Sequence, residues 1–187
     1  MFFFKTFSMK NFLIIVFSLI FTLRMKAQET SKVSNNLFKI NILSPGLTFE
    51  KRVSKNNTIC LDGNIAYGFN YTTNNGFTNL FSPYIRGQFR NYYNFEKRIA
   101  KGKNTLNNSG NFLAFTTSYY LQPIGNKDLV NNLDGFTLGA TWGLQRTYKS
   151  GFNINLNTGL GYNFSTLKDR TVVPIINFTV GWVLFSK

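Results

Sequence analysis

The chain of 187 residues contains no histidine, one cysteine and only seven acidic residues. Because histidine is missing, we exclude nucleophilic triads that depend on it and ordinary histidine metal sites. A single cysteine excludes an intramolecular disulfide framework and every zinc site built from several cysteines. The few acids stand against 21 Lys and Arg, so the formal net charge is +14. That charge points to nucleic acid or an anionic membrane as partner, and the positions of the cations must decide between them.

Long hydrophobic runs are also scarce, and the longest lies near the N-terminus. Residues 12–23 are almost wholly apolar, two lysines precede them, and Ala27 offers a small residue for cleavage. This order is that of a secretory signal peptide, which we predict at 1–28, before a mature domain at 29–187. A retained helical anchor is the alternative, although the run falls short of the roughly 20 residues that a membrane-spanning helix needs. Removal of the signal takes away four cations and leaves a net charge of +10.

The mature chain alternates between large apolar and small polar residues. Near its C-terminus, for example, Phe152, Ile154 and Leu156 alternate with asparagines. A period of two predicts β-strands. The six long predicted strands exceed the average globular strand of about 5–6 residues, and each suffices for a tilted membrane-spanning strand of about 9–11. The long strands are expected at 58–71, 80–93, 110–121, 135–147, 151–164 and 172–186.

The two faces of these strands differ in bulk. One face carries large apolar and aromatic side chains, and the other carries mostly Asn, Gly, Thr and Ser. An eight-stranded barrel has an interior only wide enough for side chains to fill, so the bulky face does not fit inside. Small polar residues inside and apolar residues outside are typical of a lipid-embedded barrel. The alternative is a secreted soluble barrel, with the opposite orientation and an apolar ligand inside.

The strand count depends on residues 37–53. Ser44, Pro45 and Gly46 interrupt this segment, and Pro-Gly favours a turn. Bacterial single-chain barrels have an even number of antiparallel strands, so we divide the segment into strands at 37–43 and 46–53. This predicts a closed antiparallel barrel of eight strands. A single kinked strand in an odd or open barrel is the alternative.

An even strand count places both termini on the same side, which we take to be the periplasm. The extracellular connections are then 44–45, 72–79, 122–134 and 165–171, and the periplasmic ones are 54–57, 94–109 and 148–150. The segment 94–109 is long for a periplasmic turn. We expect a short helical turn in it, around residues 95–100.

Several short segments of the mature chain carry a resemblance to a known family. They are the signal end at 27–28, the barrel opening at 38–45, and the stretches 48–52, 90–94 and 101–103. The chain resembles the small, largely uncharacterised outer-membrane β-barrel proteins of Bacteroidetes-type Gram-negative bacteria. The resemblance covers the mature chain, and it implies an outer-membrane barrel with no established activity.

Four charged residues are predicted to point into the lumen. They are Glu50, Asp62, Arg86 and Arg90, placed there by the alternation of their strands. Two carboxylates at a fixed spacing are what a glycoside hydrolase needs. Buried charges require partners, however, and arginine pairs well with carboxylates. We therefore interpret the four as a structural charge network that fills the lumen, and Cys60 as a small inward filler.

A basic cluster lies in the 94–109 connection and consists of Lys97, Arg98, Lys101 and Lys103. In a cytosolic protein such a cluster, with aromatic neighbours, could bind nucleic acid. Behind a signal peptide it is either solvated or faces lipid headgroups at the periplasmic side, and we predict no nucleic-acid partner. The predicted topology puts a net charge of zero on the extracellular segments, +4 on the strands and +6 on the periplasmic segments and termini.

Aromatic residues gather near the predicted strand ends, as in the two girdles of membrane barrels. The outer girdle is expected to hold Tyr71, Tyr119, Tyr162 and Phe164. The inner girdle is expected to hold Phe49, Phe89, Tyr93, Phe112, Phe152 and Trp182.

Taken together, the sequence predicts an all-β, closed, eight-stranded transmembrane barrel in the cell outer membrane. We expect a structural or interaction role, no enzymatic activity, no cofactor and no metal. The expected partners are outer-membrane lipids, the barrel-assembly machinery and an unidentified protein or envelope component, met through 122–134, 165–171 or 94–109. Besides the soluble ligand-binding barrel, a narrow channel stays open as an alternative, and it would require an unobstructed lumen.

Overall fold

The computed structural model describes residues 33–72, 76–121, 124–125, 135–164 and 171–187. The predicted signal peptide and most of the predicted loops at 122–134 and 165–171 lie outside the described residues. No helix in the described part of the chain is both long and apolar enough to cross a membrane.

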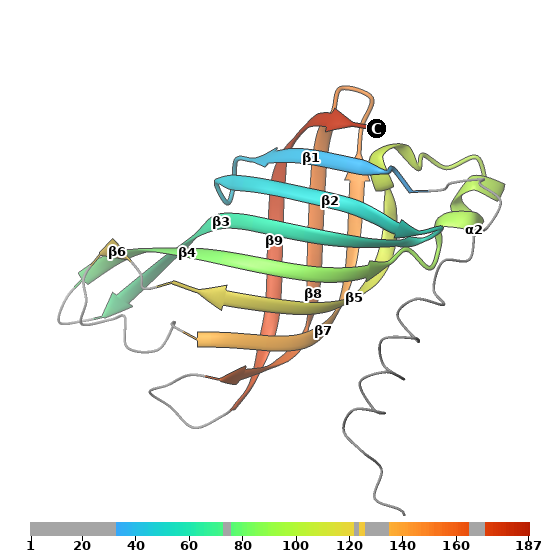
Figure 1. The fold of residues 1–187 in the computed structure, drawn as a ribbon. Coiled ribbons are helices and arrows are strands. Elements are labelled where there is room, and N and C mark those ends of the chain that lie inside the picture. Colours follow the sequence, from blue (N-terminus) through green and yellow to red (C-terminus); the bar gives the residue numbers. More distant parts are fainter. Residues whose placement is uncertain (1–32, 73–75, 122–123, 126–134, 165–170) are drawn as a thin grey trace, which may run out of the picture. The chain divides into compact units, whose positions relative to one another are not determined.

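Eight antiparallel strands of the described chain form a closed ring (Figure 1). Each strand pairs with the next along the chain, and the last, β9, pairs with the first, β1. A short strand, β6 (Ile124–Gly125), adds to β4 beside Leu80 and Phe81. The ring strands are β1 (Asn36–Asn41), β2 (Gly46–Ser54), β3 (Asn57–Thr72), β4 (Gly76–Asn91), β5 (Gly110–Tyr120), β7 (Gly135–Thr147), β8 (Phe152–Phe164) and β9 (Thr171–Ser186).

The segment 37–53 folds as two strands, which confirms the predicted count of eight and makes the single kinked strand wrong. Pro45 lies in the turn between β1 and β2, where no ladder hydrogen bond needs its missing N–H. The predicted connection at 72–79 is too long, because β3 and β4 continue pairing up to Thr72 and Gly76.

Two short helices occupy the connection between β4 and β5. The helix α2 (Phe95–Ala100) confirms the predicted helical turn, and a 3-10 turn, η1 (Leu106–Asn108), follows it. The side chain of Phe95 is fully buried and packs edge-on against Tyr92. This segment therefore folds back onto one end of the ring, which we call the α2 end.

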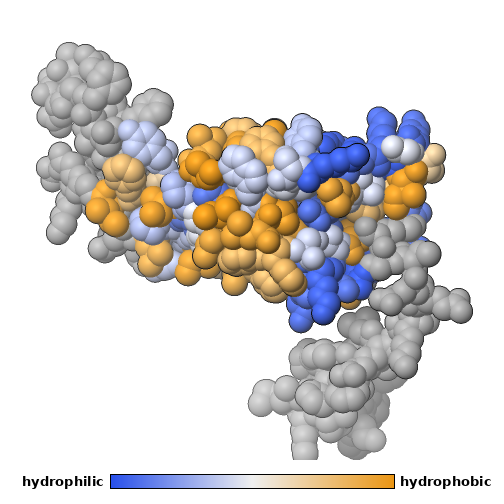
Figure 2. Space-filling view, turned by 90° about the horizontal axis from the view of Figure 1, so that it is seen from above, coloured by the Kyte–Doolittle hydropathy of each residue, from blue (hydrophilic) through white to orange (hydrophobic). Residues whose placement is uncertain are grey.

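The faces of the ring are arranged as the alternation predicted, with bulky apolar residues outside. Ile176 is 74% exposed and Leu160 is 65% exposed, although both lie in the middle of strands. Figure 2 shows apolar side chains over the wall of the ring and hydrophilic residues gathered towards the α2 end. The interior is polar, and its buried side chains include Thr48, Asn64, Ser82, Gln88, Thr116, Thr141, Asn155 and Asn157.

The strands are strongly staggered around the ring. Lys39 on β1 pairs directly with Val183 on β9. If the register partners are instead followed from Lys39 in the other direction, through β2, β3, β4, β5, β7 and β8, they lead to Thr171 on β9, which is 12 residues before Val183. In a closed barrel a large stagger goes with a large strand tilt, so these strands are strongly tilted relative to the barrel axis.

The β1–β2 hairpin ends early on the side away from α2, while β9 reaches beyond it. The last bond between them runs from the Ile42 N–H to the Val180 oxygen, at 2.8 Å. Beyond this point the backbone edge of β9 that faces β1 has no partner among the described residues. That edge includes Pro174, which has no N–H to leave unpaired, and the N–H groups of Val172, Ile176 and Phe178.

Candidate functional site: a charged interior and a cationic end

Asp62 and Arg86 lie side by side on β3 and β4, where they are direct register partners. An Asp62 oxygen lies 2.8 Å from both Nε and Nη2 of Arg86, and the two side chains are 3% and 4% exposed. The hydroxyl of Thr48 donates to the other Asp62 oxygen at 2.6 Å. The carboxylate therefore has both a counter-charge and a hydrogen bond on each oxygen, as a buried charge requires.

Glu50 lies deeper towards the α2 end and has more partners. One carboxylate oxygen lies 3.4 Å from Nη1 of Arg90 and 3.9 Å from Nζ of Lys39. The other oxygen accepts hydrogen bonds from three donors, all within 2.9 Å. These donors are the hydroxyls of Tyr92 and Thr58 and the amide of Asn108.

The two cations beside Glu50 are held by a second set of amides. Arg90 donates from Nε and Nη2 to the Gln88 oxygen at 3.0 and 2.6 Å, and its guanidinium lies 4.5 Å over the Phe112 ring. Lys39 donates to the Gln145 oxygen at 2.7 Å. The network thus joins β1, β2, β4 and β7 across the ring.

The structure therefore brings the four predicted lumen residues together as two neighbouring ion pairs. The Glu50–Arg90 pair lies nearer the α2 end than the Asp62–Arg86 pair. The sequence prediction missed Lys39, which makes three interior cations against two carboxylates. Its position was readable from alternation, because Ile40 faces outward and its neighbour Lys39 therefore faces inward. Cys60 is fully buried, as predicted.

A layer of asparagines and one tyrosine lies beyond the ion pairs. Asn41 donates to Thr48 and Asn64, and the Tyr84 hydroxyl accepts from Asn177 at 3.0 Å. Three polar atoms in this region are buried without a hydrogen-bond partner among the described residues, namely Oγ of Ser82 and Oδ1 of Asn157 and of Asn177. No group of metal-ligating side chains occurs in the part of the chain that the structure describes.

Aromatic residues close the interior at the α2 end. Tyr92, Phe95 and Phe112 form a buried cluster with Val33 and Ala114. Burial, and then the adjacent Glu50 carboxylate, raise the pKa of the Tyr92 hydroxyl well above its ordinary value. The Tyr92 hydroxyl therefore stays protonated and donates a hydrogen bond to Glu50. Phe112 was predicted in the inner girdle, whose side chains face outward from the barrel. That prediction is wrong, because Phe112 shares the inward face of β5 with Ala114.

The other predicted girdle residues with described side chains face outward. The exposed fractions of Phe49, Phe89, Tyr93, Tyr119, Tyr162, Phe164 and Trp182 lie between 38% and 52%. Phe152 packs edge-on against Trp182 on the same face. The side chain of Tyr71 lies outside the described residues.

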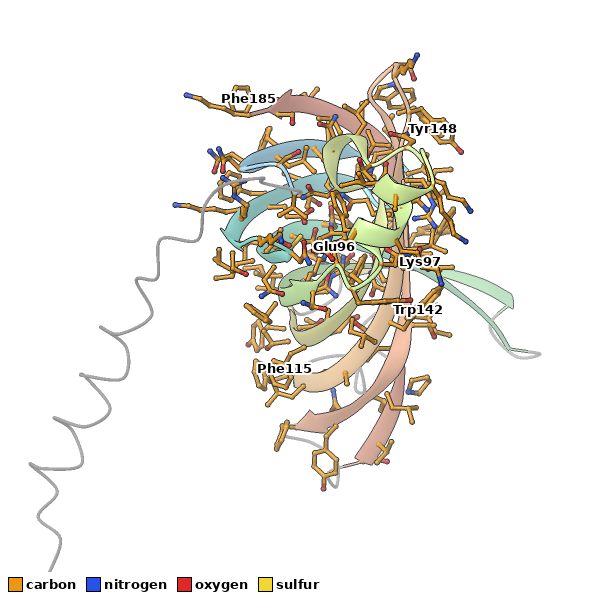
Figure 3. The ribbon with its side chains drawn as sticks, turned by 90° about the vertical axis from the view of Figure 1, so that its right-hand side faces the viewer. Glu96, Lys97, Phe115, Trp142, Tyr148 and Phe185 are labelled. Carbon is orange, nitrogen blue, oxygen red and sulfur yellow. The ribbon has the colours of Figure 1, made fainter. Side chains whose placement is uncertain are left out.

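The predicted basic cluster lies on α2 and the turn after it, at the end of the ring that Figure 3 faces. Lys97, Lys101 and Lys103 are exposed, while Arg98 is half-buried and donates twice to the Asn104 carbonyl, at 3.2 and 2.7 Å. Among the described residues, the only acid outside the interior is Glu96, which lies 3.4 Å from Lys55. Cations therefore dominate this end: Lys51, Arg52, Lys55, Lys97, Arg98, Lys101, Lys103, Arg146, Lys149 and Lys187.

Comparison of the chain with protein-family models, with curated proteins and with solved structures finds no match. Functional conclusions therefore rest on the geometry of the ring. Its interior charges are paired and enclosed, an arrangement suited to holding strands together. Its outer wall is apolar, and its α2 end is cationic.

Proposed function

We propose that this chain is an outer-membrane β-barrel with a side-chain-filled lumen, made after removal of a signal peptide at 1–28. Its role is structural or one of interaction, without catalysis, cofactor or metal. One observation carries the proposal. Charged and amide side chains are buried inside the ring, while large apolar side chains cover its outside. Exposing that apolar outer surface to water would cost much free energy, whereas contact with lipid would not.

The soluble ligand-binding barrel has less support, because most of the described interior side chains are polar or charged, whereas it would need an apolar lining. The ion pairs and the aromatic cluster at the α2 end also weigh against a channel. The proposal keeps the resemblance to small outer-membrane barrels, and with it the assembly machinery and outer-membrane lipids as partners. The α2 end, with its cations, is then periplasmic.

Fractionation of cells that express the full chain tests the proposal. We expect the mature protein in the outer membrane, resistant to extraction with alkaline carbonate, beginning near Gln28 or Glu29 by N-terminal sequencing. A folded barrel should also migrate differently in electrophoresis before and after boiling. A monomer that is soluble without detergent after signal removal would overturn the membrane assignment.

A further inference from the structure

A groove of about 410 Å³ runs along the outer wall over β4, β5 and β7. Its floor is low because Ala140 stands between the larger Phe115 and Leu160 on the neighbouring strands. Its sides are Phe89, Leu113, Phe115 and Trp142, all directed outward. The groove is therefore apolar, and it opens to whatever surrounds the barrel.

The groove has a polar margin towards the α2 end. Trp142 donates from its indole nitrogen to the Tyr93 hydroxyl at 2.8 Å. Tryptophan and tyrosine are enriched where a membrane passes from hydrocarbon to headgroups, because each ring has an apolar body and a polar tip. This pair thus lies where the groove approaches its polar margin.

Two arginines lie beyond this margin. Arg146 occupies the same face of β7 as Ala140 and Trp142, and it donates to the Gly110 carbonyl at 2.9 Å and to the Asn111 side chain at 2.7 Å. Arg98 of α2 is joined to this part of β7 through Asn104, which accepts two hydrogen bonds from Arg98 and donates to the carbonyl of Thr147, the residue after Arg146, at 2.7 Å. Neither guanidinium has a carboxylate partner among the described residues, so neutral oxygens hold two like charges near each other.

The spacing along β7 matches one leaflet of a bilayer. Ala140 and Arg146 are six residues apart, which at about 3.3 Å per residue and a tilt of about 45° gives about 14 Å along the membrane normal. Half of a hydrocarbon core of about 30 Å is about 15 Å. A lipid with its headgroup at the arginines would therefore lay one acyl chain along the groove.

We propose that this surface is a binding site for a single anionic phospholipid, with an acyl chain over Ala140 and the phosphate between Arg98 and Arg146. The inference rests on the proposed membrane location. Like charges without carboxylate partners favour an anionic headgroup, and the length and apolar walls of the groove favour an acyl chain. Lys97, next to Arg98 on α2, adds a third cation at this end of the ring (Figure 3).

The two tryptophans of the chain provide the test. The full chain is reconstituted into phosphatidylethanolamine vesicles that contain a small fraction of phosphatidylglycerol with brominated chains, which quench tryptophan on contact. A Trp182→Phe protein reports on the groove through Trp142, and a Trp142→Phe protein reports on ordinary surrounding lipid through Trp182. We expect Trp142 to be half-quenched at about a tenfold lower fraction of phosphatidylglycerol than Trp182, since each cation near a membrane surface adds to the attraction.

Substitutions in the Trp182→Phe background locate the effect. Arg98→Gln with Arg146→Gln should remove the difference, whereas Lys51→Gln with Lys149→Gln removes two cations from the same end and should leave it. Ala140→Leu fills the groove and should reduce it, while Gly63→Leu adds the same side chain to an open part of the outer wall and should not.

The outcomes separate the two proposals. Equal quenching of the two tryptophans, or a difference that survives Arg98→Gln with Arg146→Gln, would overturn the lipid site alone. Absence of quenching at both tryptophans would contradict the membrane location and the site together. Brominated phosphatidylethanolamine that quenches Trp142 as effectively as brominated phosphatidylglycerol would show an acyl groove without headgroup selection, and would also overturn the proposal.

Discussion

Glu50 is the residue on which the interior charges depend most. Its carboxylate compensates Arg90 and Lys39 and accepts three further hydrogen bonds, all in a fully buried position. Removal of one member of a buried ion pair leaves its partner charged and unpaired, which costs more than the pair contributes when intact. The side chain is therefore needed for stability even where it adds little net stabilisation.

We expect Glu50→Gln to lower the free energy of unfolding by about 3–5 kcal/mol, since two buried cations lose their counter-charge. Equilibrium urea unfolding of the refolded protein in detergent micelles measures the change. Glu96→Gln is the matched control, because Glu96 is exposed and its pairing with Lys55 should contribute about 0–1 kcal/mol. Equal effects of the two substitutions would contradict the importance of the interior pairing.

Tyr92 predicts a pH dependence. Its pKa is raised in the folded protein by burial and by Glu50, from an ordinary value of 10.0. The folded state therefore keeps a proton that the unfolded state releases above about pH 10, so this contribution to stability is present below pH 10 and is lost as the pH rises further. We expect wild type to lose more stability between pH 9 and about pH 11 than Tyr92→Phe does. Parallel pH profiles of the two proteins would contradict the assignment.

The alternation of residues identified Glu50, Asp62, Arg86 and Arg90 as inward, because a period of two leaves no other choice within a regular strand. The alternation could not predict which acid pairs with which arginine, because the pairing depends on the register between strands. The inward direction of Tyr92 was readable, because it has the parity of Arg86 and Arg90 within the predicted strand at 80–93. Asn108 was beyond the reach of the alternation, because it lies in a 3-10 turn, where no period applies.

At the scale of the elements, α2 acts as a cover for one end of the ring. Only Phe95 of this helix is buried, and its ring lies against Tyr92. Asn94, just before the helix, accepts a hydrogen bond from the N–H of Asn111 on β5, at 2.8 Å, and so fixes the helix to the wall. A helix of six residues would not be stable alone, so this contact decides its position.

Phe95→Ala should lower the free energy of unfolding by about 3–5 kcal/mol, the usual cost of removing a buried phenylalanine. Ile99→Ala on the same helix is the control and should cost much less, because Ile99 is 47% exposed. The same urea titration measures both. If the two substitutions cost equal amounts, α2 does not cover the interior through Phe95.

Element boundaries were predictable where turn residues interrupt the alternation, as at Pro45 and at Lys55-Asn56. They were less so at 72–79, where polar residues such as Thr72 and Asn79 indicated a loop but the backbone continues to pair. Thr and Asn are acceptable in a strand whose neighbour supplies the hydrogen bonds. Composition alone therefore ended β3 and began β4 at the wrong residues.

At the scale of the whole molecule, the paired interior predicts that the barrel does not conduct ions freely. Side chains of β1, β2, β4 and β7 meet across the ring, and the aromatic cluster closes one end. We expect no stepwise conductance when the purified full chain is incorporated into planar bilayers. Discrete, reproducible current steps from monodisperse protein would instead support the narrow channel and contradict the filled lumen.

The charge distribution gives the molecule a direction. The interior holds three cations and two acids, and the remaining described cations lie at the α2 end. The large net charge of the described residues is thus divided between the interior and one end of the ring. In the proposed orientation, with the α2 end in the periplasm, this charge would lie against phosphates of the inner leaflet.

The open edge of β9 has a consequence for the membrane itself. The N–H groups of Val172, Ile176 and Phe178 have no partner among the described residues. Hydrocarbon cannot satisfy such groups, so in the proposed membrane location water or lipid headgroups would have to reach them. In the proposed orientation these groups lie on the outer side, where the β1–β2 hairpin has already ended. The bilayer would therefore be locally thinner beside β9 than beside β4 and β5. In the proposed membrane location, a barrel with an uneven upper rim of this kind would deform the bilayer on one flank only.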